Sequence, residues 1–75
     1  MASKELEAEV LEALRFGASP VGAIAERARV DPDEVLDVLL DLEQQSLVRR
    51  HRAPPSTPAL RSWWELTIRG HALAG

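Results

Sequence analysis

Apolar positions recur at helical spacing through most of the first 46 residues, and most clearly between residues 32 and 45. One side of that stretch is apolar and the other is acidic or polar, as in Val35, Val38, Leu39 and Leu42 against Asp33, Asp37, Asp41 and Gln44. Such a pattern predicts an amphipathic helix with one face on a core. Asp31 can cap its first turn, Pro32 suits the first helical position, and Glu34 completes a capping box.

Two shorter amphipathic stretches precede this helix. The first, about 4–16, is capped by Ser3, followed by Gly17, and has the apolar stripe Leu6, Val10, Ala13 and Leu14. The second, about 20–28, opens with Ser19-Pro20 and has the stripe Val21, Ile24, Ala25 and Ala28. Only residues 29–31 separate it from the helix at about 32–45, so the two must cross sharply. This spacing predicts a helix-turn-helix.

The pattern changes to strand-like runs after Ser46. A β-branched and basic run begins at Leu47, and a second run, 61–66, follows a loop, 53–60, that contains three prolines. These runs predict a hairpin, or wing, over about 47–66. The two-residue period of a strand places Trp64 on the inward side with Leu66, and Trp63 and Glu65 on the outward side. Thr67 then caps a short terminal helix, about 68–74, in which Gly70 limits stability.

These elements predict one domain over residues 1–75. Its fold class is mainly α with a small β-hairpin (α+β), that is, a three-helix winged helix-turn-helix. A third short strand near Ala18 is also expected. A chain of 75 residues has a small core and little room for a catalytic cavity.

Composition argues against several functions. There is no cysteine, and His51 and His71 lack partners at metal-ligand spacing, so we expect solvated histidines and no metal or cofactor. No nucleophile–base pair or phosphate loop is present, so an enzyme is not expected. No apolar run is long enough to cross a membrane and the N-terminus has no signal-peptide pattern, so a cytoplasmic protein is expected.

The order of elements, with the runs 24–27, 30–35 and 66–73, resembles a winged helix-turn-helix domain of the MarR and PadR groups of bacterial regulators. The resemblance implies a transcriptional regulator that binds double-stranded DNA, with contacts from the basic wing and the N-terminus of the second helix. In DNA-binding relatives the third helix enters the major groove. Two positions depart from the resemblance. Ser46 stands where such domains usually have glycine, so a left-handed position there would be less comfortable. The third helix is acidic, where relatives usually present basic or amide side chains.

Charge is distributed unevenly along the chain. Residues 1–46 carry four basic and eleven acidic side chains, whereas residues 47–75 carry five basic and one acidic. Basic residues beside aromatics can bind phosphates and stack on bases. The candidate nucleic-acid site is therefore the wing, with Arg49, Arg50, Arg52, Arg61 and Trp63. Arginine stems over a tryptophan face are equally typical of ordinary surface packing.

The acidic third helix favours another function, which is protein–protein interaction by a winged helix that does not bind DNA. Its candidate surface is Asp33, Leu36, Asp37, Leu40 and Asp41. Leu36 and Leu40 lie off the main apolar stripe, so either the stripe is broad or these leucines form a docking patch. A homodimer in which the acidic helix meets the basic hairpin is one form of this alternative. The acidic face could also serve only solubility.

Overall fold

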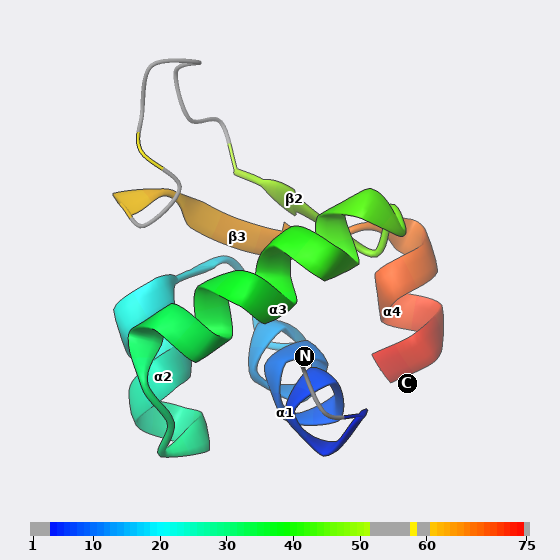
Figure 1. Cartoon of the computed structure of the whole chain (residues 1–75). Helices are drawn as coiled ribbons and strands as arrows, with labels where there is room; N and C mark the ends of the chain where they lie inside the picture. Colours follow the sequence, from blue (N-terminus) through cyan, green and yellow to red (C-terminus); the bar gives the residue numbers. More distant parts are fainter. Residues whose placement is uncertain (1–3, 52–57, 59–60, 75) are drawn as a thin grey trace.

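The computed structural model describes residues 4–51, 58 and 61–74. The elements follow in the order α1 (Lys4–Leu14), β1 (Ser19–Pro20), α2 (Val21–Ala28), α3 (Pro32–Gln44), β2 (Val48–Arg50), β3 (Trp63–Leu66) and α4 (Ile68–Ala74). Figure 1 shows α3 crossing the molecule between α2 and α4, with the sheet on one side and α1 on the other. The predicted α+β winged-helix fold is confirmed.

The first helix ends earlier than expected, at Leu14 instead of near Phe16. The N–H groups of Arg15 and Gly17 donate to the carbonyls of Glu12 and Leu14 at 3.2 Å, which closes the last turns tightly. Gly17 then adopts a φ of 131°, a conformation that glycine accepts without strain. The predicted Ser3 cap lies outside the described residues.

Ser19 and Pro20 form a strand before α2 and do not begin the helix, which corrects the expected start at about residue 20. Pro20 is the N-cap, with extended angles of −76° and 161°, and no described side chain caps the helix. β1 pairs antiparallel with β3, Ser19 opposite Trp64 and Pro20 opposite Trp63. Because Pro20 lacks an N–H, it is tolerated on this edge strand. The expected third strand near Ala18 is therefore present.

Both ends of α3 are fixed by local hydrogen bonds. At the start, the Asp31 carboxylate accepts from the Asp33 N–H at 3.4 Å. At the end, Ser46 has a φ of 63°, and the N–H groups of Ser46 and Leu47 donate to the carbonyls of Glu43 and Leu42, each at 3.0 Å. This pattern is a Schellman motif, with serine in the left-handed position that glycine usually occupies.

We expect Ser46→Gly to stabilise the protein by about 0.5–1 kcal/mol, because glycine adopts the left-handed conformation without steric cost. Denaturant unfolding measures the change. Asp41→Gly, in the interior of the same helix, is the control and should instead destabilise by about 0.3 kcal/mol, because aspartate is itself a poor helix former. A loss of stability in Ser46→Gly would show that the serine side chain contributes more than its backbone strain costs.

The sheet is antiparallel in the order β1-β3-β2, and its register determines which side chains share a face. Val48 lies opposite Leu66, Arg49 opposite Glu65, and Arg50 opposite Trp64. Trp64 and Leu66 are buried, whereas Trp63 is exposed, so the predicted alternation is confirmed. Of the predicted loop 53–60, only Pro58 is among the described residues.

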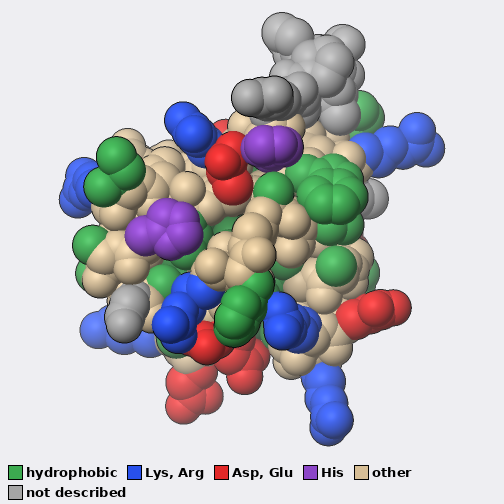
Figure 2. Space-filling view, turned by 180° about the vertical axis from the view of Figure 1, so that it is seen from behind, with side chains coloured by type: hydrophobic (Ala, Val, Ile, Leu, Met, Phe, Trp, Pro, Cys, Tyr) green, Lys and Arg blue, Asp and Glu red, His purple; other side chains and the backbone are tan. Residues whose placement is uncertain are grey.

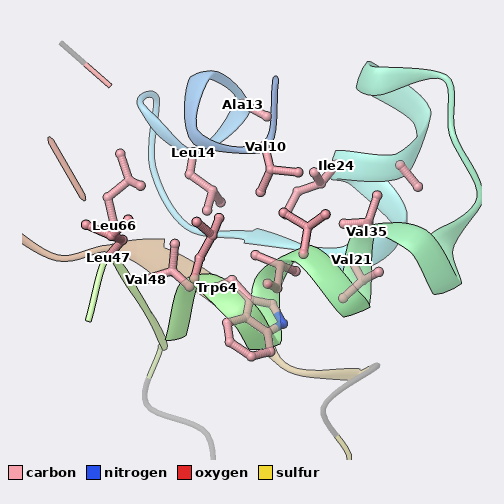
Figure 3. Packing of buried hydrophobic residues seen from close by; sticks show 14 residues of the cluster. Val10, Ala13, Leu14, Val21, Ile24, Val35, Leu47, Val48, Trp64 and Leu66 are labelled. Atoms are coloured by element: carbon pink, nitrogen blue, oxygen red, sulfur yellow. The ribbon is translucent and has the colours of Figure 1, made fainter. Parts of the chain in front are cut away.

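The core is assembled from the apolar stripes of α1, α2 and α3, Leu47 and the inner face of the sheet, with Trp64 at its sheet side (Figure 3). Val35, Val38, Leu39 and Leu42 from α3 are at most 1% exposed. Leu36 and Leu40 are half-buried and pack against the same core. The apolar stripe of α3 is therefore broad, which is one of the two arrangements that the sequence allows.

Thr67 connects the ends of α3 and α4. Its hydroxyl donates to the Ser46 carbonyl at 2.6 Å and accepts from the Gly70 N–H at 3.1 Å, which is the predicted cap. Its backbone N–H donates to the Leu47 carbonyl at 3.0 Å. These bonds hold the start of α4 against the turn between α3 and the wing.

Candidate nucleic-acid and protein interfaces

The outer face of the wing carries a mixed cluster of charged and aromatic side chains. Arg49 and Glu65 face each other across the two strands, and the His51 N–H donates to the Trp63 carbonyl at 2.7 Å. Arg49 has 69% of its side chain exposed, and Trp63 is 52% exposed. Figure 2 shows this face, with acidic, histidine and hydrophobic side chains side by side. The outer wing therefore offers a cation and an aromatic surface to a partner.

Glu65 contacts two basic residues, His51 and Arg49, within this cluster. Its Oε1 accepts from His51 Nδ1 at 2.7 Å and lies 3.6 Å from Arg49 Nε. The hydrogen bond from His51 lowers the pKa of the Glu65 carboxyl below its ordinary 4.5; partial burial opposes this, and the Arg49 charge adds to it. His51 is thus not a simple solvated side chain, which corrects the sequence interpretation. Only the strand register could have indicated the pair.

The lowered pKa of Glu65 predicts a pH dependence of stability. Folding lowers this pKa, so ionised Glu65 stabilises the folded protein. This contribution is complete above about pH 4.5, the ordinary pKa, and is lost as the pH falls through the lower pKa that Glu65 has in the folded protein. Glu65→Gln should therefore reduce the fall in unfolding free energy between about pH 5 and pH 3. Denaturant melts across this range measure it, with Glu26→Gln, an exposed site on α2, as control. A Glu65→Gln profile parallel to wild type would contradict the assignment.

Arg50 lies on the opposite face from Arg49. Its guanidinium lies over the Trp64 ring, 5.3 Å from the centroid, and its Nε is 3.7 Å from Glu43 Oε2. That ion pair is too long for a hydrogen bond, and Nε is buried without an acceptor among the described residues. With 35% of its side chain exposed, Arg50 connects the wing to α3. Its first contacts are therefore within the protein.

The other predicted wing residues are placed as follows. Arg61 is exposed and precedes the buried Ser62, whose hydroxyl donates to the Pro58 carbonyl at 3.1 Å. Arg52 lies outside the described residues. The structure therefore places Arg49 and Trp63 on the outer face, Arg61 two residues before β3, and Arg50 on the inner face.

The outward side of α3 is acidic. Asp33, Asp37 and Asp41 are exposed, and between them lie the half-buried Leu36 and Leu40. No lysine or arginine occurs between residues 32 and 44. A phosphate backbone brought against this helix would meet carboxylates and no cation of the helix itself.

A groove between α1 and α2 is a feature that the sequence interpretation missed. It has a volume of about 430 Å³ and is lined by Ala8, Glu9, Glu12, Ala13, Phe16, Arg27 and Ala28. The Arg27 guanidinium lies 5.2 Å from the centre of the Phe16 ring, and Phe16 is 75% exposed. The sequence interpretation places Phe16 at the end of the first helix, and nothing in its spacing marks it as a surface residue.

Two further kinds of site are absent among the described residues. No group of three or more His, Cys, Asp or Glu side chains is arranged to hold a metal ion. None of the described helices is long and apolar enough to span a membrane.

Comparison with known proteins identifies one family model, described as the DprA winged helix domain, which matches residues 1–60. No curated protein matches the chain.

Solved structures with the same fold include MarR family regulators. A point mutant of ZitR from Lactococcus lactis is 28% identical in sequence to this chain, and the two structures superpose with a TM-score of 0.77. The match covers 92% of this chain and 46% of the ZitR chain. Wild-type ZitR, solved in complex with DNA, is 24% identical with a TM-score of 0.80. This match covers 99% of this chain and 49% of the ZitR chain. NMB1585 of Neisseria meningitidis, a MarR family regulator, is 22% identical with a TM-score of 0.83. This match covers 93% of this chain and 49% of the NMB1585 chain. This chain thus spans about half the length of these proteins.

Proposed function

Because the chain belongs to the DprA winged helix domain family, we propose that it is a DNA-binding module of the regulator type that contacts double-stranded DNA mainly through its wing. A protein of the same fold, ZitR, has been solved in complex with DNA, which supports a duplex as the ligand. The observation that carries the proposal is the separation of charge. The wing presents the exposed arginines Arg49 and Arg61, whereas the exposed side of α3 carries acidic residues and no arginine or lysine.

Electrostatics argues against the usual insertion of α3 into the major groove. Asp33, Asp37 and Asp41 near phosphates would each cost on the order of 1 kcal/mol at surface dielectric, about as much as one good phosphate contact gains. A carboxylate can accept from cytosine, but no cation on this helix would hold it against the backbone. Contacts through the wing avoid this repulsion.

The wing itself offers few phosphate contacts. Arg49 shares Glu65 with His51, which reduces its effective charge, and Arg50 is engaged with Trp64 and Glu43. Arg49, Arg61 and Arg52 remain as the cations of the proposed interface, and Trp63 supplies a flat apolar surface beside them. Binding through so few contacts is expected to be weak and sensitive to salt.

We expect the affinity for duplex DNA to fall with salt with a logarithmic slope of about −2 to −3, since two to three phosphates are neutralised. Arg49→Ala with Arg61→Ala should reduce that slope by about 2 units and remove most of the affinity. Fluorescence anisotropy of a labelled duplex at several salt concentrations measures both. Arg15→Ala, which removes an exposed arginine near the end of α1, is the matched control.

Two further results decide between the wing and α3. Asp37→Lys with Asp41→Lys should raise non-specific affinity, because it replaces repulsion by phosphate contacts. If the protein binds a defined sequence at nanomolar strength in physiological salt, and the wing double variant binds equally well, then α3 reads the bases and the proposal is wrong.

A second function is favoured by the surface of α3, which combines exposed Asp33, Asp37 and Asp41 with half-buried Leu36 and Leu40. Apolar side chains surrounded by carboxylates suit a basic, amphipathic protein surface. An amphipathic peptide of lysine and leucine is the probe. If its NMR titration shifts α3 amides, if Leu36→Glu abolishes the effect, and if no duplex binds even at low salt, the protein-binding function replaces the first.

A further inference from the structure

Four neighbouring side chains on the outer face of the wing form one cluster, which we call the outer cluster: Arg49, His51, Trp63 and Glu65. Arg49 lies opposite Glu65, and His51, one residue beyond β2, donates its backbone N–H to the Trp63 carbonyl at 2.7 Å. This bond continues the ladder and places His51 diagonally across from Glu65, within reach of long side chains. The position of each charged group is therefore set by the pairing of the two strands.

Glu65 is the one carboxylate of the outer cluster, and a single oxygen of it serves two basic side chains. Its Oε1 lies 2.7 Å from His51 Nδ1 and 3.6 Å from Arg49 Nε. The first contact is a hydrogen bond, and the second is an ion pair that is too long for one. A neutral imidazole with its proton on Nδ1 donates this bond as well as an imidazolium does. Protonation of His51 therefore changes the charge of the cluster and leaves the hydrogen bond in place.

The net charge of the outer cluster depends on that proton. While His51 is neutral, the charges of Glu65 and Arg49 cancel. When His51 is an imidazolium, its charge cancels that of Glu65 and the charge of Arg49 is uncompensated. An imidazole ordinarily titrates at about pH 6.5. The hydrogen bond from His51 lowers the pKa of the Glu65 carboxyl below its ordinary 4.5, so the carboxylate stays ionised while the imidazole titrates.

The elements packed around the wing do not offset this change of charge. β1 has no charged residue, and α4, which packs on β3, carries the exposed Arg69 and His71. Arg61, two residues before β3, is exposed as well. α3 packs on β2 and approaches it with Glu43, which lies against Arg50 on the opposite face of the sheet. Within the part of the chain that the structure describes, no hydrogen bond or ion pair joins these groups to the outer cluster.

We propose that His51 and Glu65 regulate the DNA contact of Arg49, so that uptake of a proton by His51 releases the arginine from Glu65 and makes its charge available to a phosphate. This inference rests on the proposed contact between the wing and duplex DNA and adds its regulation. Neutralising one further phosphate corresponds to about tenfold in affinity at about 50 mM salt and steepens the salt slope by about 1 unit. The wing therefore binds DNA more tightly in mildly acidic solution than in mildly alkaline solution.

The experiment is fluorescence anisotropy of a labelled duplex at about 50 mM salt, from about pH 8 to about pH 5.5, a range centred near the ordinary pKa of imidazole. The wild type should bind about tenfold more tightly at the acidic end. His51→Gln still offers a hydrogen-bond donor but takes up no proton, so it should keep the weaker affinity throughout. Glu65→Gln should bind about tenfold more tightly than wild type at the alkaline end, because no carboxylate cancels Arg49. His71→Gln, which removes the exposed histidine of α4, is the matched control and should keep the wild-type profile.

A second measurement needs no DNA and separates this inference from the proposed function. In NMR spectra of the free protein, the Arg49 Nε–H resonance should shift together with the His51 ring resonances as the pH falls, and it should stay fixed in His51→Gln. An Arg49 resonance that does not follow His51, a pH response of affinity that survives in His51→Gln, or wild-type affinity of Glu65→Gln at the alkaline end would each overturn the inference. If the Arg49 resonance follows His51 but no duplex binds at any pH, the coupling within the outer cluster is supported and the proposed function is wrong.

Discussion

Leu39→Ala is expected to destabilise the protein by about 2–4 kcal/mol, the range for a buried leucine whose removal leaves a cavity. Leu39 is 0% exposed and lies in the α3 stripe that contacts α1, α2 and the sheet. A chain of 75 residues has a total stability of about 4–11 kcal/mol at usual values per residue. Much of the folding free energy would thus be lost. Urea or guanidinium unfolding of both proteins measures the difference.

Leu36→Ala is the matched control, because Leu36 lies on the same helix but is only half-buried. Its loss should be below about 1.5 kcal/mol, since part of its surface already contacts water. A shift of less than about 1 kcal/mol for Leu39→Ala would mean that the wrong face of α3 has been assigned to the core.

The second large effect is expected at Gly70. A methyl group added there would overlap the backbone carbonyl oxygen of Leu47 and touch Leu66 Cδ2 at 3.0 Å. The oxygen also accepts from the Thr67 N–H, so it cannot move without breaking the turn between α3 and the wing. We expect Gly70→Ala to cost about 1–3 kcal/mol, although alanine is the better helix former.

Gly22→Ala is the control for this prediction. Gly22 is also helical, and a methyl group there would meet no described atom within 4 Å. It should stabilise α2 by about 0.5–1 kcal/mol through helix propensity alone. The two substitutions should therefore change the free energy of unfolding in opposite directions, which thermal or denaturant unfolding measures. A neutral or stabilising Gly70→Ala would show that α4 can move away from Leu47 at little cost.

Features that depend on local sequence were predictable for this protein. The start of α3 follows from Asp31 and Pro32, because a capping side chain and a fixed φ act within one turn. The inward position of Trp64 and the outward position of Trp63 follow from the two-residue period of a strand. The left-handed residue at Ser46 was expected only from the resemblance to winged-helix domains, which usually have glycine there.

Features that depend on how elements meet were decided by the tertiary structure. His51 pairs with Glu65 because of the register between β2 and β3, and strand period alone does not specify register across a long loop. Arg50 separates from Arg49 because Trp64 and Glu43 are brought to the inner face. Ser19 and Pro20 became a strand because β3 offered an edge with which to pair.

The groove between α1 and α2 belongs to the same group of features. It is defined by what a neighbouring helix leaves uncovered, and a periodic pattern cannot report that. The sequence by itself determined the elements, their inner faces and the uneven charge, because those properties come from neighbours within a few residues. The tertiary structure decided which charged and aromatic side chains remain available to a partner, because contacts between distant residues occupy the others.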